Sequence, residues 1–214
     1  MKKLFCFIFF LSLIIFSNIY FAQEQQTIQL PSPQKEIGKP LMQALNLRHS
    51  TRSFNNTPLP MQELSNILWA AFGINRPELG KRTAPSAMNW QEISIYVTTE
   101  EGVFIYDAVN NSLKKIMSED IRELTGVQEF TKIAPINLVY ISDYSKTGNI
   151  SKEDKILFSS ADVGFIAQNV YLYCASQGLG AVVRGMINRD VLSKKLELKP
   201  EQKIMLAQTI GYPK

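Results

Sequence analysis

The sequence predicts one α+β domain, in which a mixed or antiparallel sheet is flanked by helices and a long apolar helix passes through the core. Three observations lead to this prediction. Residues at alternate positions from 93 to 98 are apolar and a turn at 100–102 leads into a second strand at 103–106, residues 136–141 form an almost continuous apolar run, and residues 154–177 have the composition of a buried helix. About 190 residues in one domain are enough to bury a sizeable core.

The first 22 residues have the organisation of a secretory signal peptide. Lys2 and Lys3 precede an apolar run over residues 4–16, and Ala22 suits the last position before a cleavage site. Tyr20 is bulky where a small residue is preferred, so an uncleaved membrane anchor is the alternative. We therefore expect an exported, periplasmic protein that is anchored in the membrane only if this segment is retained, and has no stable membrane insertion otherwise.

Residues 23–39, rich in Gln and Pro, are expected to form a flexible leader before a domain over 40–214. Without residues 1–22 the chain has 21 basic and 19 acidic residues, and its formal charge falls from +4 to +2. No Lys/Arg cluster is interleaved with aromatic residues, which argues against nucleic acid as a partner. Cys174 is then the only cysteine and His49 the only histidine, which excludes an internal disulfide and the usual His-based zinc sites.

Two helices are expected before the hairpin, and a proline begins each of them. The first extends from Pro40 to Leu47, and the second from Pro60 to Phe72, where Gly73 ends it. In the second helix the apolar residues fall on one face, which predicts a core role for Leu64, Ile67, Leu68, Ala71 and Phe72.

The hairpin turns at residues 100–102, and a second turn at Asn110 and Asn111 leads to a third strand over 113–117. Ser118 is expected to cap a helix that stops at Gly126. The apolar run at 136–141 is expected to be a central strand that is covered on both faces.

The long helix is expected to end at Gly178. Its polar residues Asp162, Gln168 and Asn169 are expected to bind backbone or capping groups of neighbouring elements. The remaining elements are a strand at 181–183, a helix at 189–196 that Asn188 caps, and a strand at 203–210 that closes the sheet.

Arg48, His49, Ser50 and Arg52 follow the first helix and combine two guanidinium groups, a hydroxyl and neighbouring backbone amides. This combination suits a phosphate. The alternative is a solvated basic helix end, where arginine meets the negative pole of the helix dipole.

The segment RTAPSAMNWQ at 82–91 combines small residues with an amide just before a strand, a composition that can hold a flat, polar cofactor. Pro85, Ser86, Ala87 and Asn89 are the candidate contacts. An ordinary turn is the alternative. The glycines at 178–185 permit close backbone approach near Val183, Arg184 and Gly185.

Together these segments resemble the nitroreductase family of FMN-dependent oxidoreductases. The resemblance covers residues 40–214 and rests on the Arg-x-Ser-x-Arg pattern, the Pro-Ser-x-x-Asn loop, the long helix leading to Gly178-Leu179-Gly180, and the closing Ile210-Gly211-Tyr212-Pro213. The compact hairpin and the segment RTAPSA at 82–87 look most like the branch that contains the azoline-oxidising dehydrogenases of peptide maturation.

The resemblance implies an intertwined homodimer with two FMN molecules, each held between the two chains. Arg48, His49, Ser50 and Arg52 of one chain would hold the phosphate, the ribityl chain and the pyrimidine edge, His49 mainly through its main chain. Pro85, Ser86, Ala87 and Asn89 would come from the partner chain, and Val183, Arg184 and Gly185 would lie over the ring. Larger family members have a further Lys at the pyrimidine edge and basic residues beyond the Gly-Tyr-Pro segment, for which Arg82 and Lys214 are the candidate substitutes here.

The resemblance further implies that NAD(P)H reduces the flavin, which then reduces a nitroaromatic, quinone or similar small molecule. No general acid is evident in the sequence. Two alternatives stay open: a dehydrogenase or oxidase of a peptide or other organic substrate, and a flavin-binding module without efficient turnover.

Overall fold

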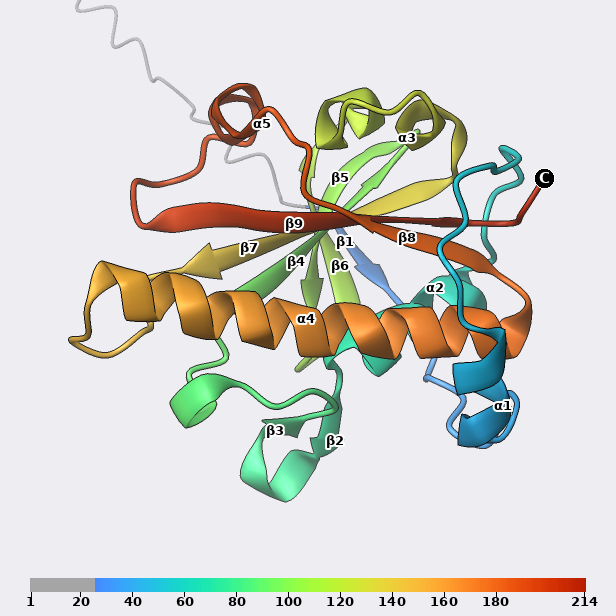
Figure 1. The fold of residues 1–214 in the computed structure, drawn as a ribbon, viewed down its shortest axis with the longest axis horizontal. Helices are drawn as coiled ribbons and strands as arrows, with labels where there is room; N and C mark the ends of the chain where they lie inside the picture. Colours follow the sequence, from blue (N-terminus) through green and yellow to red (C-terminus); the bar gives the residue numbers. More distant parts are fainter. Residues whose placement is uncertain (1–25) are drawn as a thin grey trace, which may run out of the picture.

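The structure, a computed structural model, describes residues 26–214, so the expected signal peptide at 1–22 lies outside the described residues. Its centre is a sheet of seven strands (Figure 1). The strands are β1 (Thr27–Gln29), β4 (Ile93–Thr99), β5 (Gly102–Asp107), β6 (Ser112–Met117), β7 (Ile136–Asp143), β8 (Gly180–Arg184) and β9 (Gln202–Gly211). Their order is β1-β6-β5-β4-β7-β9-β8, and all neighbouring pairs are antiparallel.

Helices cover both faces of this sheet (Figure 1). They are α1 (Leu41–Leu47), α2 (Met61–Phe72), α3 (Phe130–Ile133), α4 (Lys152–Gln177) and α5 (Arg189–Lys195). Three 3₁₀ turns are η1 (Pro77–Leu79), η2 (Ala87–Asn89) and η3 (Arg122–Thr125), and a small separate ribbon pairs β2 (Ile74–Arg76) with β3 (Lys81–Arg82). The antiparallel α+β architecture predicted from the sequence is confirmed.

The core consists of two apolar layers, one on each face of the sheet. The larger layer packs α2 and α4 against the sheet, and the smaller one packs α5 against the opposite face. β7 contributes to both, because Leu138 and Tyr140 lie in the first layer while Val139 and Ile141 lie in the second. The expected central strand, covered on both faces, is confirmed.

The long helix α4 buries only one of its faces. Val163, Ile166, Val170 and Cys174 lie against the sheet and are at most 1% exposed, whereas Phe165 is 49% exposed. The helix therefore lies across the sheet (Figure 1), and does not pass through the middle of the core as the sequence suggested. Gly178 ends it with a φ of 76°, a left-handed conformation that glycine adopts without strain.

The prediction of a flexible leader over 23–39 is wrong for residues 27–31. Thr27–Gln29 pair with β6 as an edge strand, and the side chain of Leu30 is buried at 3% exposure. The carbonyl of Pro31 accepts hydrogen bonds from Ser65 and Asn111, which holds the segment against α2 and β6. The folded domain therefore begins before residue 40.

Two smaller expectations also differ from the structure. Ser118 does not cap a helix; the Asp120 carboxylate binds the backbone and guanidinium of Arg122, and this favours the short turn η3. Strand β9 does not close the sheet, since it lies between β7 and β8. β8 is consequently an edge strand, which leaves one side of its backbone open to other groups.

Candidate functional site

The segment that follows α1 is docked on the free edge of β8, and we call residues 48–52 the arginine segment. The Thr51 N–H donates to the Ala181 carbonyl at 3.0 Å. The Tyr171 hydroxyl of α4 accepts the Val183 N–H at 2.8 Å and lies 3.0 Å from the Ser50 hydroxyl. Because Tyr171 can accept one hydrogen bond and donate another, it joins the arginine segment to β8.

The free edge of β8 presents main-chain groups beside the arginine segment. Successive residues of a strand direct their N–H and C=O groups to alternate sides. Since Ala181 and Val183 point away from β9, Gly185 is expected to face the same open edge. Gly185 is exposed, and a Cβ added to it would meet only the Leu206 side chain, at 3.6 Å.

Positive charge gathers at the arginine segment without acidic partners. Within residues 26–214, neither Arg48 nor Arg52 forms an ion pair, and the Arg48 guanidinium lies 5.4 Å from the centre of the Tyr171 ring. The backbone N–H of Lys214 donates to the Ser53 carbonyl at 3.2 Å, so the C-terminus is held next to this segment. Arg48 and Arg52 form no ion pair among residues 26–214, so their charge suits an anion at this segment.

His49 is exposed, and its Nδ1 lies 2.8 Å from the Leu47 carbonyl at the end of α1. This contact directs the imidazole back to the helix end. The expected role of the His49 main chain in ligand binding stays a prediction.

The segment at 86–91, which we call the Ser86–Gln91 loop, has an unusual backbone. Met88, Asn89 and Gln91 have φ values of 49°, 56° and 49°, a backbone conformation that residues other than glycine rarely adopt. Two hydrogen bonds hold this conformation: Gln91 N–H to the Ser86 hydroxyl at 3.1 Å, and Ala87 N–H to the Asp162 carboxylate at 2.9 Å. Non-glycine residues in this region tend to cluster at ligand sites, because the surrounding structure must maintain them.

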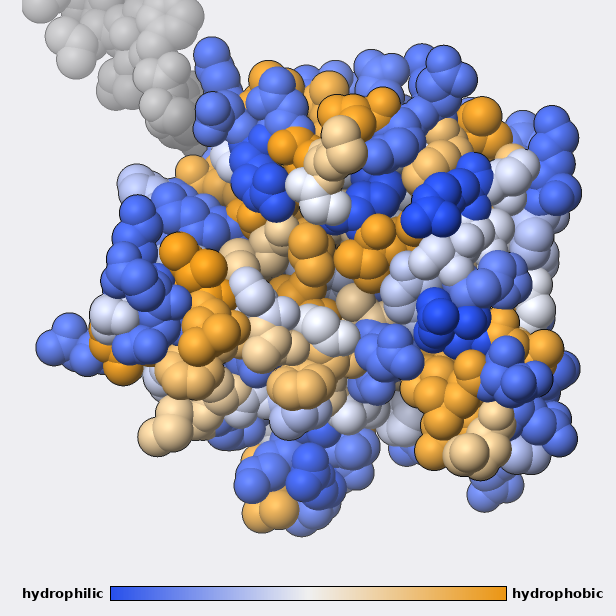
Figure 2. Space-filling view, in the orientation of Figure 1, coloured by the Kyte–Doolittle hydropathy of each residue, from blue (hydrophilic) through white to orange (hydrophobic). Residues whose placement is uncertain are grey.

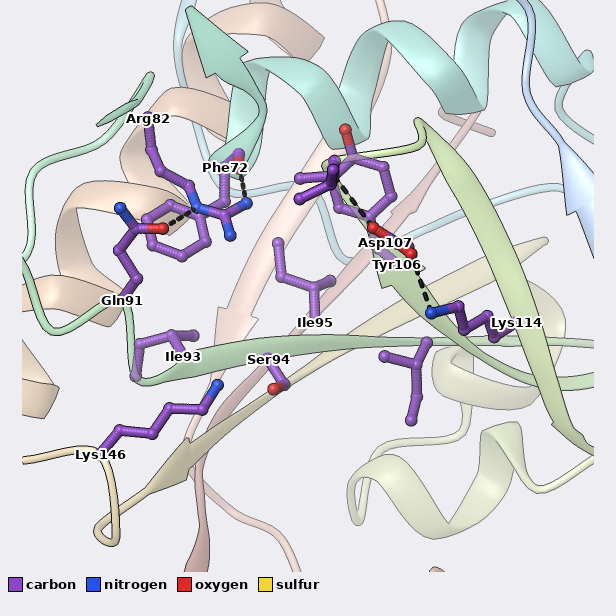
Figure 3. A pocket seen from close by; sticks show the side chains of 13 residues that line it. Phe72, Arg82, Gln91, Ile93, Ser94, Ile95, Tyr106, Asp107, Lys114 and Lys146 are labelled. Carbon is purple, nitrogen blue, oxygen red and sulfur yellow. Dashed lines mark hydrogen bonds and ion pairs between the residues drawn. The ribbon is translucent and has the colours of Figure 1, made fainter. Parts of the chain in front are cut away.

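Arg82 braces the same loop from behind (Figure 3). Its guanidinium donates to the Gln91 side chain at 2.7 Å and to the Phe72 carbonyl at 3.0 Å, and lies over the Phe72 ring. Burial lowers the pKa of Arg82, and Tyr106 and Asp107 oppose this effect. Figure 3 shows Arg82 at the border of a cavity of about 250 Å³ that Lys146 also lines. Its expected role at the pyrimidine edge stays a prediction.

The side chain of Arg184 lies inside the protein and not over a ligand ring. It is 5% exposed, and its guanidinium donates to Thr209, Asn137 and the Thr125 carbonyl. Burial lowers the pKa of Arg184 to about 10. The reason is the alternation of side chains between the two faces of the sheet: Val183 packs on the face that α4 covers, whereas Arg184 lies on the opposite face, with Asn137, Thr209 and the turn η3. Arg184 is therefore a structural residue beneath the site.

The chain does not bring all the expected residues together. The Ser86–Gln91 loop is attached to α4 at Asp162, whereas the arginine segment is attached at Tyr171. Nine helical residues separate these anchors, which corresponds to about 14 Å along the axis. Figure 1 shows the two segments at different positions along α4. Within one chain the two groups of expected residues are therefore apart, and Pro85, Ser86, Ala87 and Asn89 lie in the second group.

Sequence reasoning missed two residues of the site. Tyr171 looked like one more apolar position of the long helix, and only its hydroxyl distinguishes it from a core phenylalanine. Glu92 directly precedes the hairpin, and its place in the sequence does not indicate that its side chain is 0% exposed. Asp162 was expected to bind a backbone group of a neighbouring element, and its contact with Ala87 confirms this.

Residues 26–214 contain neither a metal-ion cluster nor a membrane-spanning helix. No group of three or more His, Cys, Asp or Glu side chains in this part of the chain can hold a metal ion. No helix in it has the length and apolar character needed to cross a membrane.

Comparison with known proteins places this architecture in a family. Residues 45–212 match the nitroreductase family. A Methanocaldococcus jannaschii protein named "putative nitroreductase" is 33% identical over 183 residues, which are 81% of this chain and 91% of the relative. A crystal structure from Ralstonia eutropha with the same name is 42% identical, has a TM-score of 0.85, and covers 89% of this chain and 90% of its own.

A more distant structure shows the fold alone. The NADPH:FMN oxidoreductase of Vibrio harveyi, solved with NAD⁺, is 20% identical with a TM-score of 0.59, over 81% of this chain and 68% of its own. The family match and the two closer relatives are sufficient for assignment. The chain belongs to the nitroreductase family, and it is an FMN-dependent oxidoreductase.

Proposed function

We propose that this protein is an exported oxidoreductase in which NAD(P)H reduces FMN, and the flavin then reduces a nitroaromatic, a quinone or a similar organic acceptor. The observation that supports this most is the arginine segment, docked by Tyr171 on the open edge of β8. Its arginines suit a phosphate, and the Gly185 N–H at the end of the β8 edge suits a flat ring.

The described residues fit FMN in chemical terms. Arg48, Arg52 and Lys214 have no ion-pair partner among residues 26–214, so they are available to a phosphate. The Thr51 hydroxyl in the same segment is buried and has no hydrogen-bond partner there. An unpaired buried hydroxyl costs stability unless a ligand or water satisfies it. The set of unpaired donors matches the phosphate and ribityl hydroxyls of FMN.

When bound, FMN supplies the hydride chemistry, and the protein supplies binding, orientation and electrostatics. Arg48 would bind the phosphate, Arg52 would lie at the pyrimidine edge, and the Gly185 N–H would face the ring. The exposed side chain of Met186, next to Gly185, lies where an acceptor would approach. The apolar Met186 side chain would favour a flat, apolar acceptor at this position.

We further propose that the functional unit is a homodimer. Apolar side chains gather over α1 and along α4 on one face of the molecule (Figure 2). The large exposed ones on these helices are Leu41, Met42, Leu45, Leu47, Ile156, Leu157, Phe158 and Phe165. An exposed apolar surface of this extent is typical of an interface. A partner packed against it would bring its Ser86–Gln91 loop toward the arginine segment and complete both half-sites.

Export is proposed from the N-terminal sequence alone. Two lysines followed by an apolar run, with Ala22 at a possible cleavage site, support it. Mass spectrometry of protein isolated from the cell envelope is the test. A mature chain that begins at Gln23 would support export, and full-length protein in the cytoplasm would contradict it.

The main experiment is an absorption spectrum of the purified protein, followed by anaerobic addition of NADH and NADPH. We expect a flavin spectrum that bleaches with one of the two donors and recovers when a quinone is added. A protein that binds FMN but is reduced by neither donor would contradict the proposed electron path, and would favour the peptide dehydrogenase or the binding module.

A further inference from the structure

Two buried carboxyl groups lie directly beneath the Ser86–Gln91 loop. Glu92 lies between the loop and β4 and is 0% exposed, and no donor group among the described residues forms a hydrogen bond of normal geometry to its carboxyl oxygens. Asp162 of α4 is 2% exposed and accepts the Ala87 N–H of the loop at 2.9 Å. The proposed electron path uses neither carboxyl group.

The surroundings of this pair contain no compensating cation. The Glu92 carboxyl faces Asp162 and Ser159 of α4, and the Ser159 hydroxyl is paired with Ser142 of β7 at 2.8 Å. Tyr144, just after β7, also faces Glu92. Lys155 is directed to the Tyr144 carbonyl at 3.3 Å, and no ion pair with either carboxyl is found within residues 26–214.

Electrostatics favour a single shared proton in this pair. Burial raises the pKa of Glu92, and the nearby Asp162 raises it further. Burial also raises the pKa of Asp162, whereas the Ala87 N–H and Glu92 oppose this. Two ionised carboxylates at close range in a dry site repel strongly, so one of them keeps its proton. Asp162, which accepts an amide hydrogen, is the better anion, and Glu92 is the better proton holder.

The sequence retains a costly group at this position. A buried Glu with no cation beside it destabilises a fold, and Gln would occupy the same volume without a charge to desolvate. The residue lies beneath a loop that has three non-glycine residues at positive φ and is attached to the core by the Asp162 contact. A local conflict of this kind, next to a binding loop, is typical of a functional constraint.

We propose that Glu92 and Asp162 are positioning residues that form a one-proton carboxyl pair and hold the Ser86–Gln91 loop in its FMN-binding conformation. With the proton present, Asp162 holds the Ala87 N–H and the loop is closed. When the pair loses this proton, the second negative charge favours a loop that has moved away and lets water reach Glu92. The inference rests on the proposed function in one respect, namely that the loop contacts FMN.

The direction of the pH dependence follows from linkage. The unfolded chain ionises Glu92 near its ordinary pKa of 4.5, whereas the folded chain keeps the proton to higher pH. The stabilisation that the protonated form confers is complete below the unfolded pKa and is lost as the pH rises through the folded pKa. The closed loop is therefore favoured at acidic pH and weakened at alkaline pH.

The first test follows the loop without FMN. Trp90 lies in the loop, with its ring centre 6.0 Å from that of Phe158, and Trp69 is the only other tryptophan. In a Trp69→Phe background, Trp90 fluorescence of the flavin-free protein is measured from pH 5 to pH 9. We expect a one-proton transition in this protein, and no transition after Glu92→Gln, because the Gln amide can donate toward Asp162 as the protonated Glu does.

A second variant separates loop control from a general loss of structure. Asp162→Asn removes the negative charge that faces Glu92 but keeps an oxygen for the Ala87 N–H. The transition should remain and shift to lower pH, because Glu92 then ionises without a like charge beside it. An identical transition in the protein with Glu92 and in the Glu92→Gln variant would overturn the proposal.

The second readout is the affinity for FMN itself. The FMN phosphate titrates near pH 6, but this contribution is common to both proteins and cancels in the ratio of their Kd values. The ratio of the wild-type Kd to that of Glu92→Gln should rise with pH, with a limiting slope of tenfold per pH unit for one proton. A constant ratio, with the Trp90 transition present, would refute the contact of the loop with FMN and leave the carboxyl pair supported as the control of the loop. A constant ratio without that transition overturns the carboxyl pair.

Discussion

Tyr171→Phe tests the connection between the arginine segment and β8. The change removes one hydroxyl that bonds the Val183 N–H at 2.8 Å and the Ser50 hydroxyl at 3.0 Å. Each neutral hydrogen bond contributes about 0.5–1.5 kcal/mol, and water can partly replace the Tyr171 hydroxyl at this half-buried edge. We expect the free energy of unfolding to fall by about 1–2 kcal/mol.

Urea unfolding followed by circular dichroism measures this loss. With a slope of about 2 kcal/mol per molar urea, the midpoint should fall by about 0.5–1 M. The affinity for FMN should fall by up to about tenfold, since about 1.4 kcal/mol of lost positioning corresponds to that factor.

Tyr173→Phe is the matched control on the same helix. The Tyr173 hydroxyl is buried and forms no hydrogen bond of normal geometry among residues 26–214, although Glu63 and Asn66 lie beside it, so its removal should cost less stability than that of the Tyr171 hydroxyl. If the two variants lose stability equally, or if neither changes FMN affinity, the role assigned to Tyr171 is wrong.

Three other predictions concern separate parts of the account. Arg52→Leu should lower the midpoint potential of bound FMN, by about 30 mV for each 1.4 kcal/mol of lost electrostatic stabilisation; potentiometry at saturating FMN decides this, and an unchanged potential leaves Arg52 a binding role only. Leu30→Ala should cost about 2–3 kcal/mol of unfolding free energy, because Leu30 is buried at 3% exposure, whereas Val109→Ala at a site 73% exposed should cost little; equal losses would contradict the packing of β1. Phe165→Glu should convert the dimer to monomers in sedimentation experiments, because it places a charge on the exposed apolar face of α4; a stable dimer would exclude that face as the interface.

The elements that the sequence predicted well are those with local signals. The apolar face of α2 repeats with the helical period, Ile93, Ile95 and Val97 of β4 recur with the strand period, and Gly178 supplies a helix end that few other residues can adopt. Each of these signals lies within the element that it specifies. The family motifs that flank them were recognised for the same reason.

The features that the sequence did not reveal depend on distant partners. The strand β1 has three residues and forms only because β6 presents an edge to it. Arg184 was expected over the flavin ring together with its neighbours Val183 and Gly185. The alternation of side chains along β8 instead directs its guanidinium to Asn137 and Thr209. In Glu92, the side chain is buried against a helix about 70 residues away, and no local pattern indicates this.

Each FMN site is proposed to contain residues of both chains. Subunit exchange between two damaged homodimers tests this sharing most directly. Arg48→Ala damages the arginine segment, and Asn89→Ala damages the Ser86–Gln91 loop, so each homodimer should bind FMN weakly. Mixed dimers of the two variants contain one intact site and one doubly damaged site. If the site is shared, FMN binding should return to about half of the wild-type stoichiometry in purified heterodimers. Heterodimers that bind no more FMN than either parent would show that each site belongs to one chain.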